Sequence, residues 1–375
     1  MAGSPTRAPA RTTGPVRVVG TGLLGASIGL GLRSYGVDVV LSDPSPTALA
    51  MARDLGAGRL PEPDDAEPAL VVVAAPPDVT ARVVAAELAA HTDAVVTDVA
   101  SVKGAPAKEV RALLGEGAGA DRYVGGHPLA GRERSGAVAA RADLFAGRPW
   151  VLTPGPDVPA EALAVVRDLV VDLGATPVLM SPDAHDAAVA RVSHVPQVVS
   201  SLVAARLTDA TEDAVALAGP GLRDVTRIAA SEPALWVQIL TANAGPVTEV
   251  LRALQRDLAS VVDALEALAD DDDAVGARAT VAAAIQHGNE DHARIPGKHG
   301  APPMRYEVVT VLVPDRPGEL GRLFSEMGEV GVNLEDLHLE HSPGQPVGLA
   351  ELSVLPAARP VLEQALAERG WVLPG

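Results

Sequence analysis

The chain has 375 residues, enough for two or three domains that each bury a core of their own. Its formal net charge is −18 and 2% of its residues are aromatic, which argues against nucleic-acid binding because that function needs a basic surface and stacking side chains. There is no cysteine, so disulfides and thiol catalysis are excluded, and no apolar run approaches the ~18 residues that a membrane-spanning helix needs.

Residues 1–14 are rich in proline, alanine and arginine and lack the apolar centre of a signal peptide. We therefore predict a disordered tail over residues 1–14, and the cytoplasm is the default compartment.

The first predicted unit, residues 16–43, is a strand, a glycine turn, a helix and a second strand that ends at an acid. Gly20, Gly22 and Gly25 form a GxGxxG motif directly after the apolar residues 16–19. Such glycines allow a tight turn, close approach of the backbone to a pyrophosphate, and close packing of the helix on the strand.

This unit predicts NAD as the cofactor. Free N–H groups at the start of the helix, where Leu23 and Leu24 lie, favour a pyrophosphate. Asp43 follows the second strand, where its carboxylate would accept hydrogen bonds from a ribose 2′-hydroxyl and repel the 2′-phosphate of NADP. The alternative is a strand–helix–strand unit that has a glycine turn but no ligand.

Apolar strand-like runs alternate with helical patterns over residues 15–180. This alternation predicts a Rossmann-type α/β domain with a doubly wound parallel sheet and helices on both faces. Ligands of such sheets bind beyond the carboxyl ends of the strands. After the first strand, the predicted strands cover residues 37–41, 70–75, 94–98, 122–125, 150–153 and 177–180.

The pattern becomes helical after Ser181-Pro182-Asp183, a helix-start signal. We assign residues 181–288 to an all-helical domain for substrate binding and dimerisation, because long helices rich in alanine, leucine and valine commonly bury their apolar stripes against a partner. The expected assembly is a homodimer. The predicted helices cover residues 183–207, 212–218, 222–230, 233–244 and 246–270.

Residues 289–304 contain prolines, glycines and mixed charge, which predict a linker. Residues 305–375 predict a small ferredoxin-like α+β domain with the order βαββαβ. Its elements are expected at residues 307–313, 317–330, 333–341, 348–354 and 359–369, followed by a short last strand.

The first candidate site follows the predicted strand 94–98. Ser101 and Lys103 would offer a hydroxyl and a cation to a substrate at the carboxyl edge of the sheet. The alternatives are a helix N-cap for Ser101 and a solvated surface position for Lys103.

The second candidate is His127, in the segment GGHPLAGRE after another predicted strand. A histidine between glycines and a proline is poorly explained by core packing, and a neutral imidazole accepts a hydroxyl proton near physiological pH. We predict that His127 is a catalytic base.

The third candidate lies in the helical domain. His194 and Gln197 are three residues apart and share a helix face, so both could point into a cleft, although such pairs are often surface or capping groups. Arg227 could clamp a carboxylate with two hydrogen bonds, although a lone arginine is commonly solvated or ion-paired. Residues 287–292 hold two histidines and two acids but lack a supporting second cluster, so we predict no metal site.

Together these motifs resemble the prephenate dehydrogenase (TyrA) family. The resemblance rests on GTGLLGASIG, DVASVK, GHPLAGRERSG, SHVPQ and GPGLRDVTRIAASEPALW, which follow in this order over residues 16–243. The segment PDRPGELGRLFSEMGEVGVNLEDL resembles an ACT domain, a module that usually binds amino acids for feedback control. The family resemblance implies NAD-dependent oxidative decarboxylation of prephenate to 4-hydroxyphenylpyruvate, CO₂ and NADH in tyrosine biosynthesis.

The resemblance also implies a role for each matching residue. His127 is the expected base at the ring hydroxyl of prephenate, and Ser101 is expected to bind that hydroxyl or orient the imidazole. Arg227 is expected to hold a substrate carboxylate, and Trp236 to close the site within one subunit or across the dimer.

His194 and Gln197 are expected at the side-chain end of the substrate pocket. Many relatives carry a second histidine where this chain has Gln197, so the role of that residue stays open.

Glu133 bears on the choice between prephenate, with a keto acid side chain, and arogenate, with an amino acid one. Its carboxylate would pair with the ammonium of arogenate, or simply with Arg132 or Arg134. The alternative functions are an arogenate or dual cyclohexadienyl dehydrogenase, a β-hydroxyacid or imine reductase, and an inactive regulator that binds NAD and an amino acid.

In the ACT-like segment, Asp315, Pro317 and Gly318 lie in a loop that enters a helix, and Asn333 starts the next predicted strand. A glycine there lets backbone N–H groups approach an amino acid carboxylate. We expect these residues to bind tyrosine as a feedback inhibitor.

Overall fold

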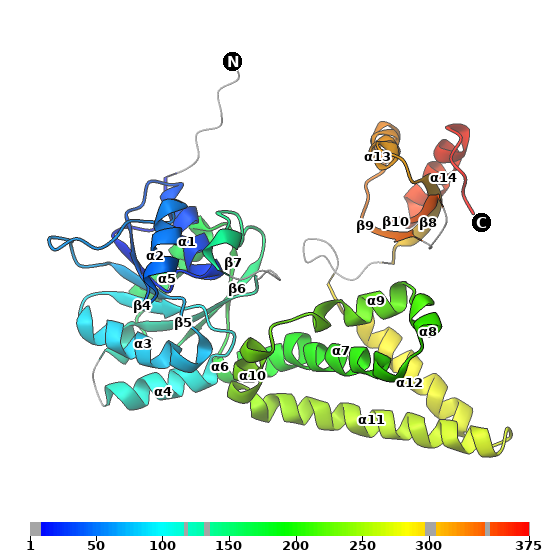
Figure 1. The fold of residues 1–375 in the computed structure, drawn as a ribbon, viewed down its shortest axis with the longest axis horizontal. Helices are drawn as coiled ribbons and strands as arrows, with labels where there is room; N and C mark the ends of the chain where they lie inside the picture. The colour runs from blue at the N-terminus through cyan, green and yellow to red at the C-terminus, as the bar shows by residue number, and fades with distance from the viewer. Residues whose placement is uncertain (1–8, 116–118, 131–135, 297–304, 342–345, 375) are drawn as a thin grey trace. The chain divides into compact units, whose positions relative to one another are not determined.

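Figure 1 shows the fold of the chain in a computed structural model, which describes residues 9–115, 119–130, 136–296, 305–341 and 346–374. The chain divides into two compact units, residues 1–254 and 255–375. No helix in the described ranges is long and apolar enough to cross a lipid bilayer.

The first unit is built on a seven-stranded sheet in the order β2-β1-β3-β4-β5-β6-β7. β1 lies between β2 and β3, so the chain passes from β1 to β2 on one side and then returns across β1 to β3 on the other, and α/β sheets bind ligands at such a switch point. The predicted doubly wound fold is confirmed. Its strands are β1 (Val16–Val19), β2 (Val39–Ser42), β3 (Leu70–Val73), β4 (Val95–Asp98), β5 (Tyr123–Pro128), β6 (Pro149–Pro154) and β7 (Thr176–Leu179), joined by α1 (Leu23–Arg33), α2 (Pro46–Asp54), α3 (Pro77–Ala90), α4 (Gly104–Leu114) and α5 (Ala160–Asp172).

The last two strands depart from the predicted all-parallel arrangement. β1 to β5 pair in parallel, but β6 is antiparallel to β5, and β7 is parallel to β6. A parallel neighbour needs a long crossover, usually a helix, whereas the described residues between β5 and β6 include only the 3₁₀ turn Ala137–Ala139. As a result, Leu152 of β6 lies opposite both Gly126 of β5 and Leu179 of β7.

Residues 9–14 are not a disordered tail. Thr12 is buried, and the backbone N–H groups of Arg11 and Thr12 donate to the carboxylate of Asp172 at 2.7–3.1 Å. Composition alone suggested disorder because the partner carboxylate lies 160 residues further along the chain. Residues 1–8 lie outside the described part.

Helices follow the sheet, as predicted. The helix expected over residues 183–207 contains a π-helical turn, Ala190–His194. Pro196 lies just after that turn and has no N–H to donate, which accounts for the local slip in hydrogen bonding. The helices are α6 (Pro182–Val189), α7 (Val195–Ala205), α8 (Glu212–Ala216), α9 (Pro220–Thr226), α10 (Pro233–Ala242), α11 (Ala244–Asp270) and α12 (Ala277–His292).

The predicted linker begins too early. α12 continues to His292, and Gln286 donates to Glu290 one turn later at 2.9 Å, so residues 289–292 are helical. No proline interrupts the pattern before residue 296, which permits the longer helix.

The C-terminal part of the second unit is an antiparallel sheet in the order β8-β10-β9, with two helices packed on its core. The predicted order holds, but the last strand is reduced to one bridge between Val372 and Leu312. This sheet is compatible with an ACT-like domain. Its elements are β8 (Glu307–Pro314), α13 (Glu319–Val330), β9 (Asp336–His341), β10 (Val347–Val354) and α14 (Arg359–Glu368).

Candidate active site

The glycine turn after β1 has the three features predicted from its sequence. Gly20 has φ +96°, and a Cβ there would lie 2.4 Å from the Ala74 carbonyl oxygen. A Cβ on Gly25 would lie 1.9 Å from the Gly20 carbonyl oxygen, so Gly25 permits the close packing of α1. No atom lies within 4 Å of a Cβ built on Gly22, so the backbone there is open to a ligand.

Asp43 lies just beyond β2, as predicted. One of its oxygens accepts from the backbone N–H and hydroxyl of Thr21 at 2.7 and 2.9 Å, and the other accepts from the N–H of Ser45 at 2.8 Å. These bonds hold the carboxylate beside the glycine turn.

A cavity of about 1850 Å³ in the first unit connects the glycine turn with the helices that follow the sheet. Most of the predicted site residues lie on its wall, whereas Gly25 packs behind the turn and Glu133 falls outside the described residues. The predicted residues on the wall are Gly20, Gly22, Leu23, Leu24, Asp43, Ser101, His127, His194, Gln197, Arg227 and Trp236.

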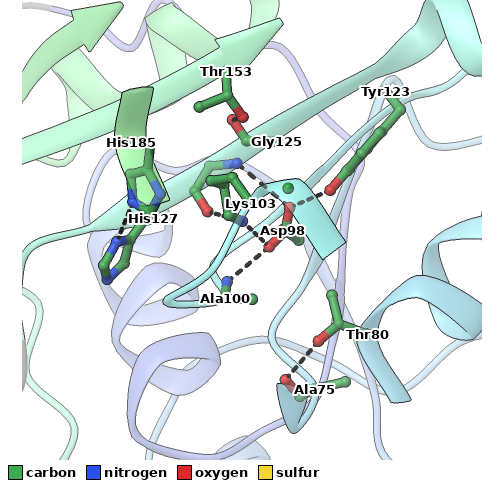
Figure 2. A network of polar contacts seen from close by, with 12 residues as sticks. Ala75, Thr80, Asp98, Ala100, Lys103, Tyr123, Gly125, His127, Thr153 and His185 are labelled. Atoms are coloured by element: carbon green, nitrogen blue, oxygen red, sulfur yellow. Dashed lines mark hydrogen bonds and ion pairs between the residues drawn. The ribbon is translucent and has the colours of Figure 1, made fainter. Parts of the chain in front are cut away.

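Lys103 is not on this wall, and the prediction that it offers its charge to a substrate is wrong. Its ammonium is fully buried, pairs with Asp98 and donates to the Gly126 carbonyl at 2.6 Å. Tyr123 donates to the same carboxylate at 2.6 Å, and Figure 2 shows Asp98 at the centre of these contacts. Burial lowers the pKa of Lys103 despite its pairing with Asp98. Lys103 therefore ties β4 to β5 beneath the cavity.

His127 is the penultimate residue of β5 rather than a loop residue after it. Its Nδ1 lies 2.8 Å from Nε2 of His185, and Nδ1 of His185 lies 2.8 Å from Oδ1 of Asp186 (Figure 2 shows the first of these contacts). Burial, with added effects from His185, Lys103 and His194, holds the pKa of His127 well below its usual value. The imidazole is therefore neutral at physiological pH and can act as a proton acceptor.

His194 and Gln197 both reach the cavity, but each is also tied to the protein. The amide nitrogen of Asn243 donates to Nδ1 of His194 at 3.0 Å and to the Asp186 carbonyl at 2.9 Å. The Trp236 ring lies edge-on to the His194 ring, and the two ring centroids are 6.1 Å apart. Ser231 donates to the side-chain oxygen of Gln197 at 3.3 Å.

Ser101 and Arg227 complete the predicted set on the wall. The N-cap of α4 is Lys103, so Ser101 is not the capping residue, and the half-buried Ser101 lies on the cavity wall. Arg227 lies in a short 3₁₀ turn after α9 and is exposed, and its guanidinium has no ion pair among the described residues. A free guanidinium on a cavity wall can hold a carboxylate.

Two family models match the chain. The nucleotide-binding domain of prephenate dehydrogenase matches residues 28–179, and the dimerization domain of prephenate dehydrogenase matches residues 181–275. The probable prephenate dehydrogenase NovF of Streptomyces niveus is 40% identical over 94% of this chain and 98% of its own length. The chain belongs to the prephenate dehydrogenase family. It is an NAD-dependent oxidoreductase of the prephenate dehydrogenase type.

Other members of the family carry more than one substrate name. The cyclohexadienyl dehydrogenase of Zymomonas mobilis is 33% identical over 65% of this chain and 85% of its own length. A structure of prephenate dehydrogenase from A. aeolicus with hydroxyphenyl propionate and NAD⁺ is 27% identical with a TM-score of 0.62, covering 76% of this chain and 98% of that one. Synechocystis arogenate dehydrogenase is 28% identical with a TM-score of 0.60, covering 74% and 98%.

Two alanine substitutions in the glycine turn are expected to have different effects, one on the stability of the fold and the other on the affinity for NAD⁺. Gly25→Ala is expected to lower the free energy of unfolding by about 3 kcal/mol, because the new Cβ meets the backbone oxygen of Gly20. Gly22→Ala meets open space and is expected to preserve stability, but to raise the Kd for NAD⁺ about 10-fold by blocking the backbone. Denaturant unfolding and NAD⁺ titration check both, and equal unfolding midpoints for the two variants would contradict the packing argument.

Sequence reasoning missed His185, Asp186 and Asn243. His185 and Asp186 were predicted only as part of the helix over residues 183–207, because the reversal of β6 and β7 that brings α6 beside His127 has no local signal. Asn243 lies inside the predicted helix 233–244, and only the fold shows its side-chain amide between His194 and Asp186.

The predicted regulatory residues lie at two ends of one helix. Asp315, Pro317 and Gly318 lie between β8 and α13, whereas Asn333 lies beyond the far end of α13, which is about 18 Å long. β9 begins at Asp336, so Asn333 is not the first residue of that strand. The side-chain amide of Asn333 donates to the carboxylate of Glu335 at 2.7 Å. Within one chain the fold does not bring the four residues into one site.

Proposed function

We propose that this chain catalyses the NAD⁺-dependent oxidative decarboxylation of prephenate to 4-hydroxyphenylpyruvate, CO₂ and NADH. The observation that carries this proposal is His127, a half-buried neutral base on the wall of a cavity that also contains the glycine turn and Arg227. Oxidation of a ring alcohol needs a base beside a nicotinamide pocket, and a cavity that holds both His127 and the glycine turn would supply both. The similarity to NovF supports the same substrate.

In this mechanism Nε2 of His127 takes the proton of the ring hydroxyl, and the electrons of that O–H bond form a carbonyl. Bound NAD⁺ supplies the hydride acceptor for the carbinol hydrogen. The ring carboxylate leaves as CO₂, its C–C electrons enter the ring, and the carbonyl π electrons return to oxygen, so the ring becomes aromatic. The protonated His127 then returns its proton to that oxygen and gives the phenol of 4-hydroxyphenylpyruvate. Aromatisation provides the driving force, so the protein's task is orientation and the movement of one proton to and from His127.

The other residues on the wall bind and orient. Gly22 and the first N–H groups of α1 would hold the pyrophosphate, and Asp43 the adenosine ribose. Ser101 would hydrogen-bond the ring hydroxyl, and Arg227 would hold a substrate carboxylate. His194 and Gln197 would line the side-chain end of the pocket, and Trp236 would close the site.

The direct test is NADH formation by the purified chain with prephenate and, separately, with arogenate. Turnover with prephenate is the expected result. Activity with arogenate alone would support the same mechanism but show that arogenate is the substrate. Relatives named arogenate and cyclohexadienyl dehydrogenase make this the alternative outcome. NAD⁺ binding without turnover of either substrate would overturn the proposed function.

The low pKa of His127 predicts the acid side of the pH profile. A base whose pKa lies below the usual 6.5 stays neutral at pH 6.5, so kcat/KM is expected to remain on its plateau there and to fall only at lower pH, as His127 becomes protonated. Measuring kcat/KM for prephenate against pH checks this, and a half-maximal value above pH 6.5 would contradict it.

Arogenate use is a further proposal for Glu133, which lies outside the described residues. The side chain would pair with the ammonium of arogenate. If so, Glu133→Gln lowers the arogenate-to-prephenate ratio of kcat/KM, and an unchanged ratio removes Glu133 from substrate choice.

Tyrosine inhibition is proposed through the ACT-like domain, supported by its antiparallel sheet and by the glycine turn at Gly318, where φ is +94°. Tyrosine is expected to lower the rate with prephenate, and Asp315→Ala to weaken that inhibition without changing the uninhibited rate. Equal inhibition of both proteins would place the effector elsewhere.

A homodimer is proposed from the matched dimerization domain and from α11. Leu254, Leu258, Val262 and Leu265 form an exposed stripe at helical spacing, 40–60% accessible in the single chain. An apolar stripe of this kind on an amphipathic helix is suited to burial against a second copy.

A further inference from the structure

We propose that His185 and Asp186 are positioning residues that keep the ring proton of His127 on Nδ1 and leave its Nε2 free to accept the substrate proton. The inference rests on the proposed function, in which His127 is the base. The observations that carry it are the two consecutive 2.8 Å contacts from His127 to His185 and from His185 to Asp186.

The first step is the state of Asp186. Its Oδ1 accepts from the N–H of Lys103, and its Oδ2 from the N–H of Gly104, both at 2.8 Å. These are free N–H groups at the start of α4, where a helix favours negative charge. Burial alone would raise the pKa of Asp186, but its hydrogen bonds with His185 and these two N–H groups lower it. Asp186 is therefore a carboxylate, which can only accept hydrogen bonds.

The second step follows the direction of the hydrogen bonds from Asp186 through His185 to His127. Since Asp186 only accepts, Nδ1 of His185 must carry a proton. The His185 side chain is fully buried, and in its neutral form the remaining nitrogen, Nε2, accepts. Nδ1 of His127 must then donate to it, which leaves the lone pair of His127 on Nε2. Figure 2 shows the second ring nitrogen of His127 pointing away from His185.

The third step concerns the charge that forms during reaction. When Nε2 of His127 takes the substrate proton, the His127 ring becomes a cation, and the carboxylate of Asp186 stabilises it through the His185 ring that lies between them. Among the described residues, the other groups that act on the pKa of His127 are His185, Lys103, which is paired with Asp98, and His194, and all three oppose a cation on His127. Asp186 is linked to His127 by hydrogen bonds through His185, and its carboxylate favours that cation.

Two pairs of variants test this assignment. Asp186→Asn is expected to lower kcat about 10- to 100-fold with little change in the KM for prephenate, and to move the acid limb of kcat/KM to lower pH. Asp183→Asn removes an exposed carboxylate from the first turn of the same helix and is expected to match the wild type.

His185→Gln and His185→Leu form the second pair, which decides the question if Asp186→Asn does not fold. A glutamine amide can accept from His127 and donate to Asp186, so its kcat is expected to stay within about 10-fold of wild type, whereas leucine makes neither bond and is expected to lose about 100-fold. Equal losses for glutamine and leucine, or an unchanged kcat and pH limb in Asp186→Asn, would overturn the proposal.

The position of the proton can be read without turnover. In ¹⁵N-histidine-labelled protein, a long-range proton–nitrogen spectrum is expected to show His127 protonated on Nδ1, with its signals assigned by their loss in His127→Asn. Protonation on Nε2 in the wild type would overturn the inference. If the wild type fails to oxidise prephenate, the proposed function fails, and this spectrum still decides the role of His185 and Asp186.

Discussion

Replacing His127 with asparagine is expected to lower kcat for prephenate oxidation about 10²- to 10⁴-fold, the usual contribution of a general base. Asparagine keeps a polar group near Nδ1 and so preserves a hydrogen bond toward His185, but has no atom at the position of Nε2. The loss is therefore expected in kcat, with the Kd for NAD⁺ unchanged because the glycine turn is untouched.

The matched control for this prediction is His287→Asn, the same chemical change on the exposed surface of α12. It is expected to leave kcat unchanged. A His127→Asn enzyme within a few-fold of wild type would remove His127 from the chemistry, and steady-state rates with both variants decide the matter.

Replacing Lys103 with methionine is expected to lower the free energy of unfolding of the first unit by about 3–5 kcal/mol, because removing one partner strands a buried charge. Both side chains of the Lys103–Asp98 pair are fully buried, so water cannot replace the lost ammonium. Asp98 still accepts from Tyr123 and from the Ala100 N–H, which does not neutralise its charge.

Denaturant unfolding followed by the fluorescence of Trp150, a buried residue of the same unit, measures this loss. Lys108→Met on the exposed side of α4 is the control and is expected to change stability by no more than about 0.5 kcal/mol. Adding Asp98→Asn to Lys103→Met is expected to restore part of the stability, since the stranded charge is then gone. Equal unfolding midpoints for the two lysine variants would contradict a buried pair.

Much of the first unit was predictable because its signals are local. The apolar runs that become β1, β3 and β4 are adjacent in sequence to the turns and helices that follow them. The glycine spacing likewise acts over one turn, and it correctly indicated an open backbone at Gly22 and close packing at Gly25. Predicted element ends were less accurate, as at residues 9–14 and 289–292, because distant partners or uninterrupted helix patterns decide them.

The sequence by itself determined the doubly wound fold, the cofactor class and the family, and most of the site residues that it predicted, His127 among them, lie on the cavity wall. Each of these depends on residues close together in the chain or on a motif. Only the tertiary structure decided that Lys103 is buried beneath the cavity rather than exposed within it, because its partner carbonyl lies 23 residues away on another strand.

The tertiary structure also decided what lies behind His127. His185 is 58 residues from it in the chain, and the two meet because β6 and β7 run opposite to β5 and start α6 beside that strand. Asp186 meets the start of α4 across 83 residues. The direction of a strand depends on how its neighbours pack and connect, so the residues that orient the base had no pattern of their own in the sequence.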